Sequence, residues 1–276
     1  MTSTPSTPST TTLTRITPSV AWRGARARRL VERNVMVYRH SWLIIFSGLF
    51  EPIFYLLSIG VGIGRLVGKV PGPGGHLLTY REFVAPALLA SASMNGAVYD
   101  STMNVFYKLK YAKIYDAVLS TPMGVDDVAR GEITWALIRG FLYAVSFIVV
   151  MLALGLVDSA WEILALPASV LIGFGFASIG MATTAYMRSW EDFEFVQLAV
   201  LPLFLLSTTF YPLSTYPRWL QIVTECTPLF HGVALLRALN EGAIGPGLLL
   251  HALYFVAMGM IGVWVASRRL GHLLLT

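Results

Sequence analysis

The stretch 201-LPLFLLSTTFYPLSTYPRWLQIVTECTPLFHGVALLRAL-239 decides the architecture of this chain. It begins as an apolar run and breaks at Tyr211-Pro212 into a segment rich in proline, threonine and aromatic residues. Pro212, Pro217 and Pro228 lack an amide donor and disfavour a continuous helix. The segment is too short and polar to cross a bilayer, and too apolar for an ordinary surface loop. Short helices that enter one leaflet and return would fit, provided that protein or a water-filled cavity satisfies their backbone.

The composition of the chain is that of a membrane protein. Of its 276 residues, 55% are hydrophobic and only 13% are charged, and the mean hydropathy is +0.66. Soluble domains carry roughly 25% charged residues. The alternative, a soluble protein whose apolar runs form its core, is disfavoured because several runs exceed about 18 residues. The single cysteine, Cys226, excludes an intramolecular disulfide and a cysteine-based zinc cluster.

The apolar runs predict an all-α membrane domain over residues 42–276. A Ser/Thr/Pro-rich leader (1–20), expected to be disordered, and an arginine-rich interfacial helix (21–41) precede this domain. Each predicted transmembrane helix is near the roughly 20 residues that a helix needs to cross the hydrocarbon. The six predicted spans are Trp42–Gly64, Phe83–Val105, Ile133–Val157, Ile163–Met187, Phe193–Phe210 and Gly247–Ala266.

The distribution of lysine and arginine predicts the orientation. With the N-terminus inside, 14 of the 20 basic residues fall in inner segments, five fall in outer segments, and Arg139 lies within a span. Positive residues favour the cytoplasmic side. Both termini are therefore expected in the cytoplasm, and the proline-broken segment (211–246) is expected on the external side.

The longest inner loop, residues 106–132, is a candidate docking surface for a partner protein. Its alternating charges and tyrosines predict a short amphipathic helix from Lys110 to Leu119, ended by Thr121-Pro122. A solvated basic loop that only sets topology is the alternative. The residues expected to contact a partner are Lys110, Lys113, Tyr115, Asp116 and Leu119.

Charged residues inside the predicted spans are candidates for function. Glu51, in the first span, should face the bundle interior, because an exposed charge there costs roughly 2.5 kcal/mol or more. Arg139 in the third span is a conceivable ion-pair partner, in either a structural or a substrate-contacting role. The second span is the least apolar, and its Asn95 is expected on a polar path. Asp100 in that span could relay protons, although a structural hydrogen-bonding role fits its position better.

The sequence carries no catalytic or metal-binding constellation. Its five histidines show no ligand spacing, and the phosphate-binding pattern G-x-x-x-x-G-K-[ST] is absent. We therefore expect no enzyme activity, no metal and no cofactor in this chain. We also expect no nucleic-acid partner, and any ATP would be hydrolysed by another polypeptide. An ion-coupled secondary transporter that uses Glu51 or Asp100 is the alternative function, and an integral-membrane enzyme is a third.

From about residue 20 onward, the chain resembles the permease subunits of ABC-2 type exporters. Within that family it looks most like the NodJ branch, named for lipo-oligosaccharide export, with the daunorubicin-resistance permeases nearby. The Ser/Thr/Pro leader falls outside the resemblance. Three stretches carry the likeness: LFEPIFYLLSIGVGIGRLVG (49–68), YDAVLSTPMGVDDVARGEITWA (115–136) and LLSTTFYPLSTYPRWLQIVTECTPLFHGVALLRAL (205–239).

The resemblance implies a type V exporter-like fold, with an interfacial helix, a coupling helix near 110–119 and re-entrant helices near 213–243. It also implies a homodimer in a bacterial plasma membrane, together with two cytosolic ATPase subunits that bind ATP and magnesium. Such a complex would export an amphiphile: a lipo-oligosaccharide, a lipid or a hydrophobic drug. The residues that we expect along the substrate path or gate are Glu51, Asn95, Phe210, Tyr211, Pro212, Tyr216 and Trp219.

Overall fold

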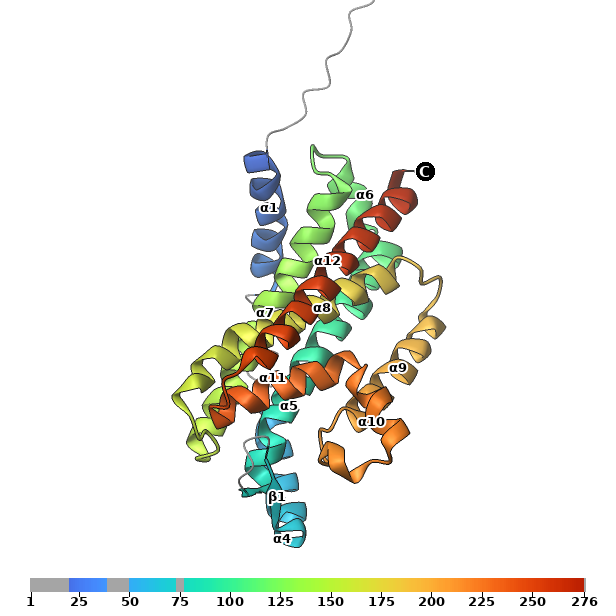
Figure 1. Cartoon of the computed structure of the whole chain (residues 1–276). Coiled ribbons are helices and arrows are strands. Elements are labelled where there is room, and N and C mark those ends of the chain that lie inside the picture. The colour runs from blue at the N-terminus through green and yellow to red at the C-terminus, as the bar shows by residue number, and fades with distance from the viewer. Residues whose placement is uncertain (1–19, 39–49, 73–76, 276) are drawn as a thin grey trace, which may run out of the picture.

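The computed structural model describes residues 20–38, 50–72 and 77–275, which are mostly helical (Figure 1). The label η marks π-helical or 3-10 turns. The elements in chain order are α1 (Val20–Tyr38), α3 (Phe50–Leu57), η1 (Ser58–Ile63), α4 (Gly64–Val67), β1 (Lys69–Pro71), β2 (Leu77–Thr79), α5 (Tyr80–Tyr99), η2 (Asp100–Asn104), η3 (Tyr107–Tyr111), α6 (Ile114–Leu119), α7 (Val125–Ala153), η4 (Ala160–Leu164), α8 (Ala165–Thr184), η5 (Trp190–Asp192), α9 (Phe193–Leu206), η6 (Leu213–Thr215), α10 (Arg218–Glu225), α11 (Pro228–Glu241) and α12 (Pro246–Leu275).

Helix α8 lies at the centre of the bundle and packs against α5, α7, α11 and α12. Small residues allow these close approaches, as in other membrane helix bundles. A Cβ atom added to Gly262 of α12 would lie 2.6 Å from the carbonyl carbon of Ser178 on α8. Gly180 of α8 faces Ser101 in η2 in the same way. The small residues of α8 therefore allow this helix to be surrounded closely by other helices.

Three helical stretches in the described part of the chain are long and apolar enough to cross a membrane. They are Val125–Ala153, Ala160–Thr184 and Pro246–Leu273. A fourth follows if α10 and α11, which meet at 84°, form one broken span. Helix α9 has 14 residues, or about 21 Å, against a hydrocarbon core of roughly 30 Å. The mostly helical membrane fold agrees with the prediction, apart from the short antiparallel pair of β1 and β2, and the number of six spans stays a prediction.

The N-terminal helix α1 packs along the start of α7. Leu30 is buried against Gly131, where an added Cβ would lie 2.8 Å from the Leu30 Cδ2 atom. Further along, the rings of Tyr38 and Trp135 are 5.3 Å apart. Helix α1 covers most of the stretch where the sequence predicts an interfacial helix, and its place at a membrane surface stays a prediction. The predicted leader lies outside the described residues, except for Val20.

Candidate functional site

Arg237 of α11 stabilises the turn at which the chain leaves α9. The predicted fifth span ends four residues early, at Leu206, and Thr208 takes a positive φ of 58°. The Thr208 carbonyl accepts a hydrogen bond of 3.0 Å from the Arg237 Nη2 atom. Arg237 also donates to the Phe83 carbonyl at 3.1 and 3.2 Å, and its guanidinium lies 3.8 Å from the Phe83 ring centroid. One buried side chain thus joins α11, the end of α9 and the start of α5.

The predicted gate residues surround this break. The Phe210 carbonyl accepts a hydrogen bond of 3.3 Å from the Tyr80 hydroxyl, and the Phe210 ring packs against Phe204. Tyr216 is half-buried, and its hydroxyl donates to the Leu205 carbonyl at 3.4 Å. The other three residues differ in exposure: the side chains of Tyr211 and Trp219 are exposed, and Pro212 lines a cavity of about 490 Å³ together with Arg237.

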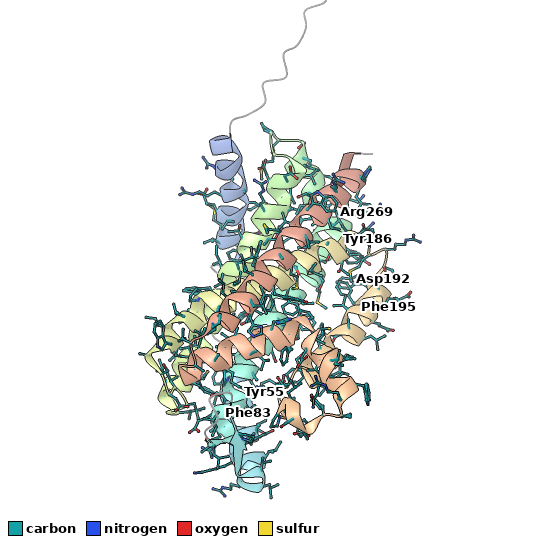
Figure 2. The ribbon with its side chains drawn as sticks, in the orientation of Figure 1. Tyr55, Phe83, Tyr186, Asp192, Phe195 and Arg269 are labelled. Atoms are coloured by element: carbon teal, nitrogen blue, oxygen red, sulfur yellow. The ribbon has the colours of Figure 1, made fainter. Side chains whose placement is uncertain are left out.

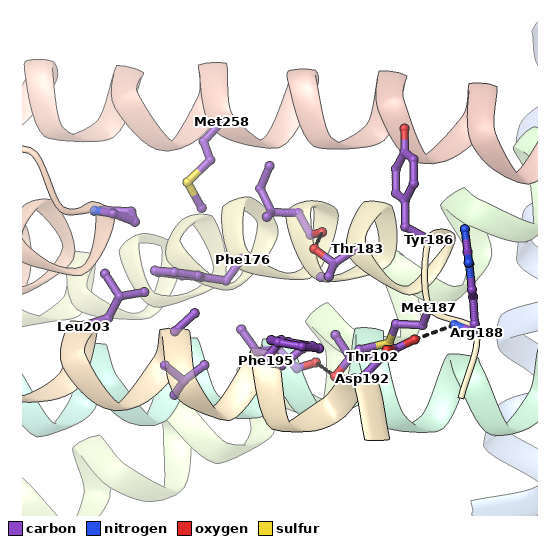
Figure 3. A pocket seen from close by; sticks show the side chains of 17 residues that line it. Thr102, Phe176, Thr183, Tyr186, Met187, Arg188, Asp192, Phe195, Leu203 and Met258 are labelled. Carbon is purple, nitrogen blue, oxygen red and sulfur yellow. Dashed lines mark hydrogen bonds between the residues drawn. The ribbon is translucent and has the colours of Figure 1, made fainter. Parts of the chain in front are cut away.

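A larger groove of about 570 Å³ lies between α8 and α9 (Figure 3). Gln197 of α9 donates a hydrogen bond of 2.8 Å to the Tyr99 hydroxyl, which links α9 to the end of α5. No side chain of α9 is fully buried, so this helix lies apart from the tightly packed bundle. The residues that line the groove are Val98, Thr102, Phe176, Ile179, Gly180, Thr183, Tyr186, Met187, Arg188, Asp192, Phe195, Val196, Ala199, Val200, Leu203, Pro228 and Met258.

The groove is apolar along its length and polar at the end near the turn between α8 and α9. In this turn, the Asp192 carboxylate accepts backbone N–H groups from Arg188 at 2.6 Å and Ser189 at 3.2 Å. These two hydrogen bonds lower the pKa of the Asp192 carboxyl below its ordinary value. Figure 2 shows Tyr186, Asp192 and Phe195 following one another at this end, next to Arg269 of α12. Such a groove, apolar with polar groups at one end, can accommodate an amphiphile.

None of the residues predicted along the substrate path lines this groove. Asn95 is half-buried in α5, and its Oδ1 atom is enclosed without a hydrogen-bond partner in the described part of the chain. Glu51 belongs to α3, but its side chain lies outside the described residues. Two groove residues, Thr183 of α8 and Tyr186 in the turn after it, were not predicted from the sequence. The Gly- and Ala-rich composition of α8 indicates helix packing and gives no sign that one edge of the helix is open.

Arg139 pairs with Asp100 in the described part of the chain. The Arg139 Nη1 atom lies 2.7 Å from the Asp100 Oδ1 atom, and both side chains are mostly buried. Arg139 also lies over the Tyr38 ring, 5.2 Å from its centroid. The suggested Glu51–Arg139 pair stays a prediction, because the Glu51 side chain lies outside the described residues. Arg139 takes Asp100 because α7 packs against η2, where Asp100 lies on the helical continuation of α5. The structure therefore favours the structural role for Asp100.

The predicted coupling helix is shorter than expected. Lys113 adopts a left-handed conformation with φ of 45°, so α6 begins at Ile114, and residues 107–111 belong to the π-helical end of the preceding helix. Lys110, Lys113 and Asp116 are exposed, and Leu119 is half-buried. Tyr115 is only 1% exposed. Burial, with the neighbouring Glu132 charge, raises the pKa of Tyr115 well above its ordinary value. The expected contact of Tyr115 with a partner is therefore wrong for this state, because the bundle covers its side chain.

A buried ion pair lies beneath α6. The Lys108 Nζ atom is 2.7 and 3.0 Å from the two carboxylate oxygens of Glu132 and 3.5 Å from the Asn34 Oδ1 atom. These three residues belong to η3, α7 and α1 respectively. Sequence reasoning treated Lys108 as a topology signal, since nothing in the pattern distinguishes it from the exposed Lys110. The pair joins the helices on which α6 rests.

Comparison with known proteins identifies the family of this chain. The family model described as ABC-2 type transporter matches residues 26–239. The chain belongs to the ABC-2 type transporter family. This confirms the resemblance found in the sequence. Membership makes the chain a bacterial membrane permease of a generally non-catalytic kind, and it implies an ABC ATPase partner in general.

Several curated ABC-2 relatives are each named nodulation protein J. The protein from Rhizobium meliloti strain 1021 is 30% identical over 213 residues, which cover 76% of this chain and 79% of that relative. The protein from Rhizobium leguminosarum bv. trifolii is 31% identical over 212 residues, with the same coverage. The protein from Sinorhizobium fredii is 28% identical over 244 residues, or 86% of this chain and 91% of that relative.

Proposed function

We propose that this ABC-2 permease exports an amphiphile across the bacterial plasma membrane, driven by a separate cytosolic ATPase. The candidate substrates are a lipo-oligosaccharide, a lipid and a hydrophobic drug. The observation that carries the proposal is the groove between α8 and α9, which is apolar along the helices and polar at the turn. A lipid tail and a polar head match these two parts. The missing phosphate-binding pattern supports a separate ATPase, which would bind ATP and magnesium.

The complex would contain two copies of this chain and two ATPase subunits. The chain would cross the membrane six times with both termini in the cytoplasm. The exposed side chains of Lys110, Lys113 and Asp116 on and before α6 would contact the ATPase. Closure of the ATPase dimer would push α6 against α7, because Tyr115 lies beside Glu132 of α7. For this push to open a path, the bundle must have two arrangements of similar free energy.

The external gate would lie at the break after α9. Arg237 ties the Thr208 carbonyl to α5, so a movement of α5 relative to α11 would stretch these hydrogen bonds. Phe210 and Pro212 would then move with the backbone that contains Thr208. Re-entrant insertion of α10 and α11 on the external side is part of this proposal, and their 84° bend supports it.

Reconstitution tests the proposal against the ion-coupled alternative. The permease would be purified from its native membrane with any bound ATPase, and both proteins and bound lipid would be identified by mass spectrometry. Vesicles with the complex should move a fluorescent amphiphile only when ATP is present. Transport by the permease alone on a proton gradient would refute the proposal. The Asp100–Arg139 ion pair already counts against Asp100 as a freely titrating coupling group.

A further inference from the structure

We propose that the groove between α8 and α9 binds a phospholipid of the cytoplasmic leaflet. One acyl chain lies along the groove, and the phosphate lies at Arg188 and Arg269. The inference rests on the proposed function, because the same groove is the site proposed for the exported amphiphile, and a binding measurement without ATP tests it separately from transport. It adds to the proposed function a resident membrane ligand of defined chemistry, held by a single copy of the chain.

The length of the groove matches one leaflet. Its wall on α8 runs from Phe176 to Thr183, and its wall on α9 runs from Phe195 to Leu203. At 1.5 Å per residue, these walls are about 11 and 12 Å long. The hydrocarbon core of a bilayer is roughly 30 Å thick, so the walls extend through most of one leaflet. An acyl chain that enters at the cytoplasmic turn would end near the middle of the membrane.

The walls of the groove offer contact area and few free polar groups. The two threonines that line it bond to their own helices: the Thr102 hydroxyl donates to the Val98 carbonyl at 2.6 Å, and the Thr183 hydroxyl donates to the Ile179 carbonyl at 2.9 Å. Met258 of α12 closes one side with a flexible thioether, which suits an irregular apolar ligand. An acyl chain in the groove would therefore contact mainly apolar atoms, because the threonine hydroxyls are already hydrogen-bonded.

The cytoplasmic end of the groove presents positive charge. Arg188 is exposed, and no ion pair forms on its guanidinium among the described residues. Asp192 is the acidic residue of the groove lining, and its Oδ2 atom already accepts two backbone N–H groups. Glu191 of the same turn and Glu194 in the first turn of α9 do not line the groove. Arg188 therefore feels the Asp192 charge but forms no direct ion pair with it, so its guanidinium donors are open to a lipid phosphate at this end of the groove.

Arg269 provides a second cation at the same end. Its guanidinium lies over the ring of Tyr186, 4.8 Å from the centroid, and Tyr186 lines the groove. Its Nε atom is enclosed and has no hydrogen-bond acceptor within the described part of the chain. Buried donors normally have a partner. A phosphate beside the half-buried guanidinium of Arg269 would accept hydrogen bonds from it, and arginine suits phosphate because its planar donors bind two oxygens together.

Native mass spectrometry of the full chain tests this inference. The detergent-purified protein is titrated with phosphatidylglycerol, with diacylglycerol of the same acyl chains, and with inorganic phosphate. We expect phosphatidylglycerol to bind at least tenfold more tightly than either control ligand. The substitutions Arg188→Gln and Arg269→Gln should each weaken phosphatidylglycerol binding at least fivefold. Arg268→Gln is the charge-matched control, because Arg268 packs on Trp264, which does not line the groove, whereas Arg269 packs on the groove-lining Tyr186.

A second pair of variants tests the position of the acyl chain. Ala199→Trp fills the groove and should abolish binding of phosphatidylglycerol, whereas Leu198→Trp adds the same ring at an adjacent position of α9 that does not line the groove and should preserve binding. Equal binding of diacylglycerol and phosphatidylglycerol would overturn the inference. Equal effects of Arg188→Gln and Arg268→Gln, or of the two tryptophan variants, would overturn it as well.

Discussion

The buried Lys108–Glu132 pair gives a sharp test of how the cytoplasmic end of the bundle is held together. The two side chains are 7% and 1% exposed, and their charged atoms approach to 2.7 Å. Replacing Glu132 with methionine removes one charge and leaves the buried Lys108 ammonium with the Asn34 Oδ1 atom at 3.5 Å in place of its carboxylate partner. Breaking one partner of a buried pair costs about 3–5 kcal/mol. Replacing both residues with methionine removes both desolvation costs and should restore most of the stability.

The expected result is a large shift in thermal unfolding. One kcal/mol shifts Tm by roughly 2–4 °C in a protein of this size, so Glu132→Met should lower Tm by roughly 6–20 °C. Thermal unfolding of a membrane protein is often irreversible, so all variants are compared at one scan rate. The control is Glu32→Gln, which removes the exposed pair of Glu32 with Arg28. An exposed i,i+4 pair contributes about 0.3–0.5 kcal/mol, and its loss should shift Tm by at most about 2 °C.

The double variant Lys108→Met, Glu132→Met shows whether the two side chains stabilise each other. If Lys108→Met and Glu132→Met together cost as much as the sum of the single substitutions, the pair does not interact, and the account of this junction fails. A Tm for Glu132→Met equal to that of Glu32→Gln would refute it equally. An intermediate Tm for the double variant, closer to wild type than either single variant, is the predicted outcome.

Three further predictions follow from packing and exposure. Gly262→Ala should cost about 1–3 kcal/mol of stability, because its Cβ would clash with Ser178; Gly271→Ala on the same helix, with open space around it, should stabilise by up to about 1 kcal/mol. Arg237→Met should cost at least about 3 kcal/mol in thermal unfolding, since three charged hydrogen bonds are lost, while the exposed Arg218→Met changes stability by less than about 0.5 kcal/mol. Asp116→Lys should uncouple ATP hydrolysis from transport at unchanged Tm, as measured by parallel ATPase and transport assays, because Asp116 is exposed. Tyr115→Ala should lower stability by about 3–5 kcal/mol, as measured by Tm, because the Tyr115 side chain is buried. Unchanged coupling in Asp116→Lys, a stable Tyr115→Ala or Arg237→Met, or equal Tm values for the two glycine variants would contradict these assignments.

The sequence predicts the helices well wherever a local rule decides them. Pro212 precedes η6, Pro217 lies just before α10, and Pro228 begins α11, as the missing amide donor of each proline requires. Apolar length likewise predicts α7, α8 and α12. The end of α9 at Leu206 was missed, because the turn at Thr208 is stabilised by Arg237, which lies 29 residues further along the chain.

Pairing between helices was beyond the sequence. Arg139 was expected beside Glu51 because both are charges within apolar runs, but only the packing of α7 on η2 determines that Asp100 is the neighbour. Tyr115 was expected on a docking surface because it alternates with lysines, yet the short α6 turns it inward. The groove depends on the separation of α8 and α9, which no local pattern encodes.

Substrate-dependent ATP hydrolysis is the most direct test of the central claim that this chain is an amphiphile-exporting permease driven by a separate ATPase. The wild-type complex and the Ala199→Trp and Leu198→Trp variants would be placed in vesicles, and ATP hydrolysis and amphiphile movement would be measured together. The account predicts that transport requires ATP and the partner ATPase, and that Ala199→Trp loses transport while Leu198→Trp retains it. Transport without ATP, or full transport by Ala199→Trp, would contradict it.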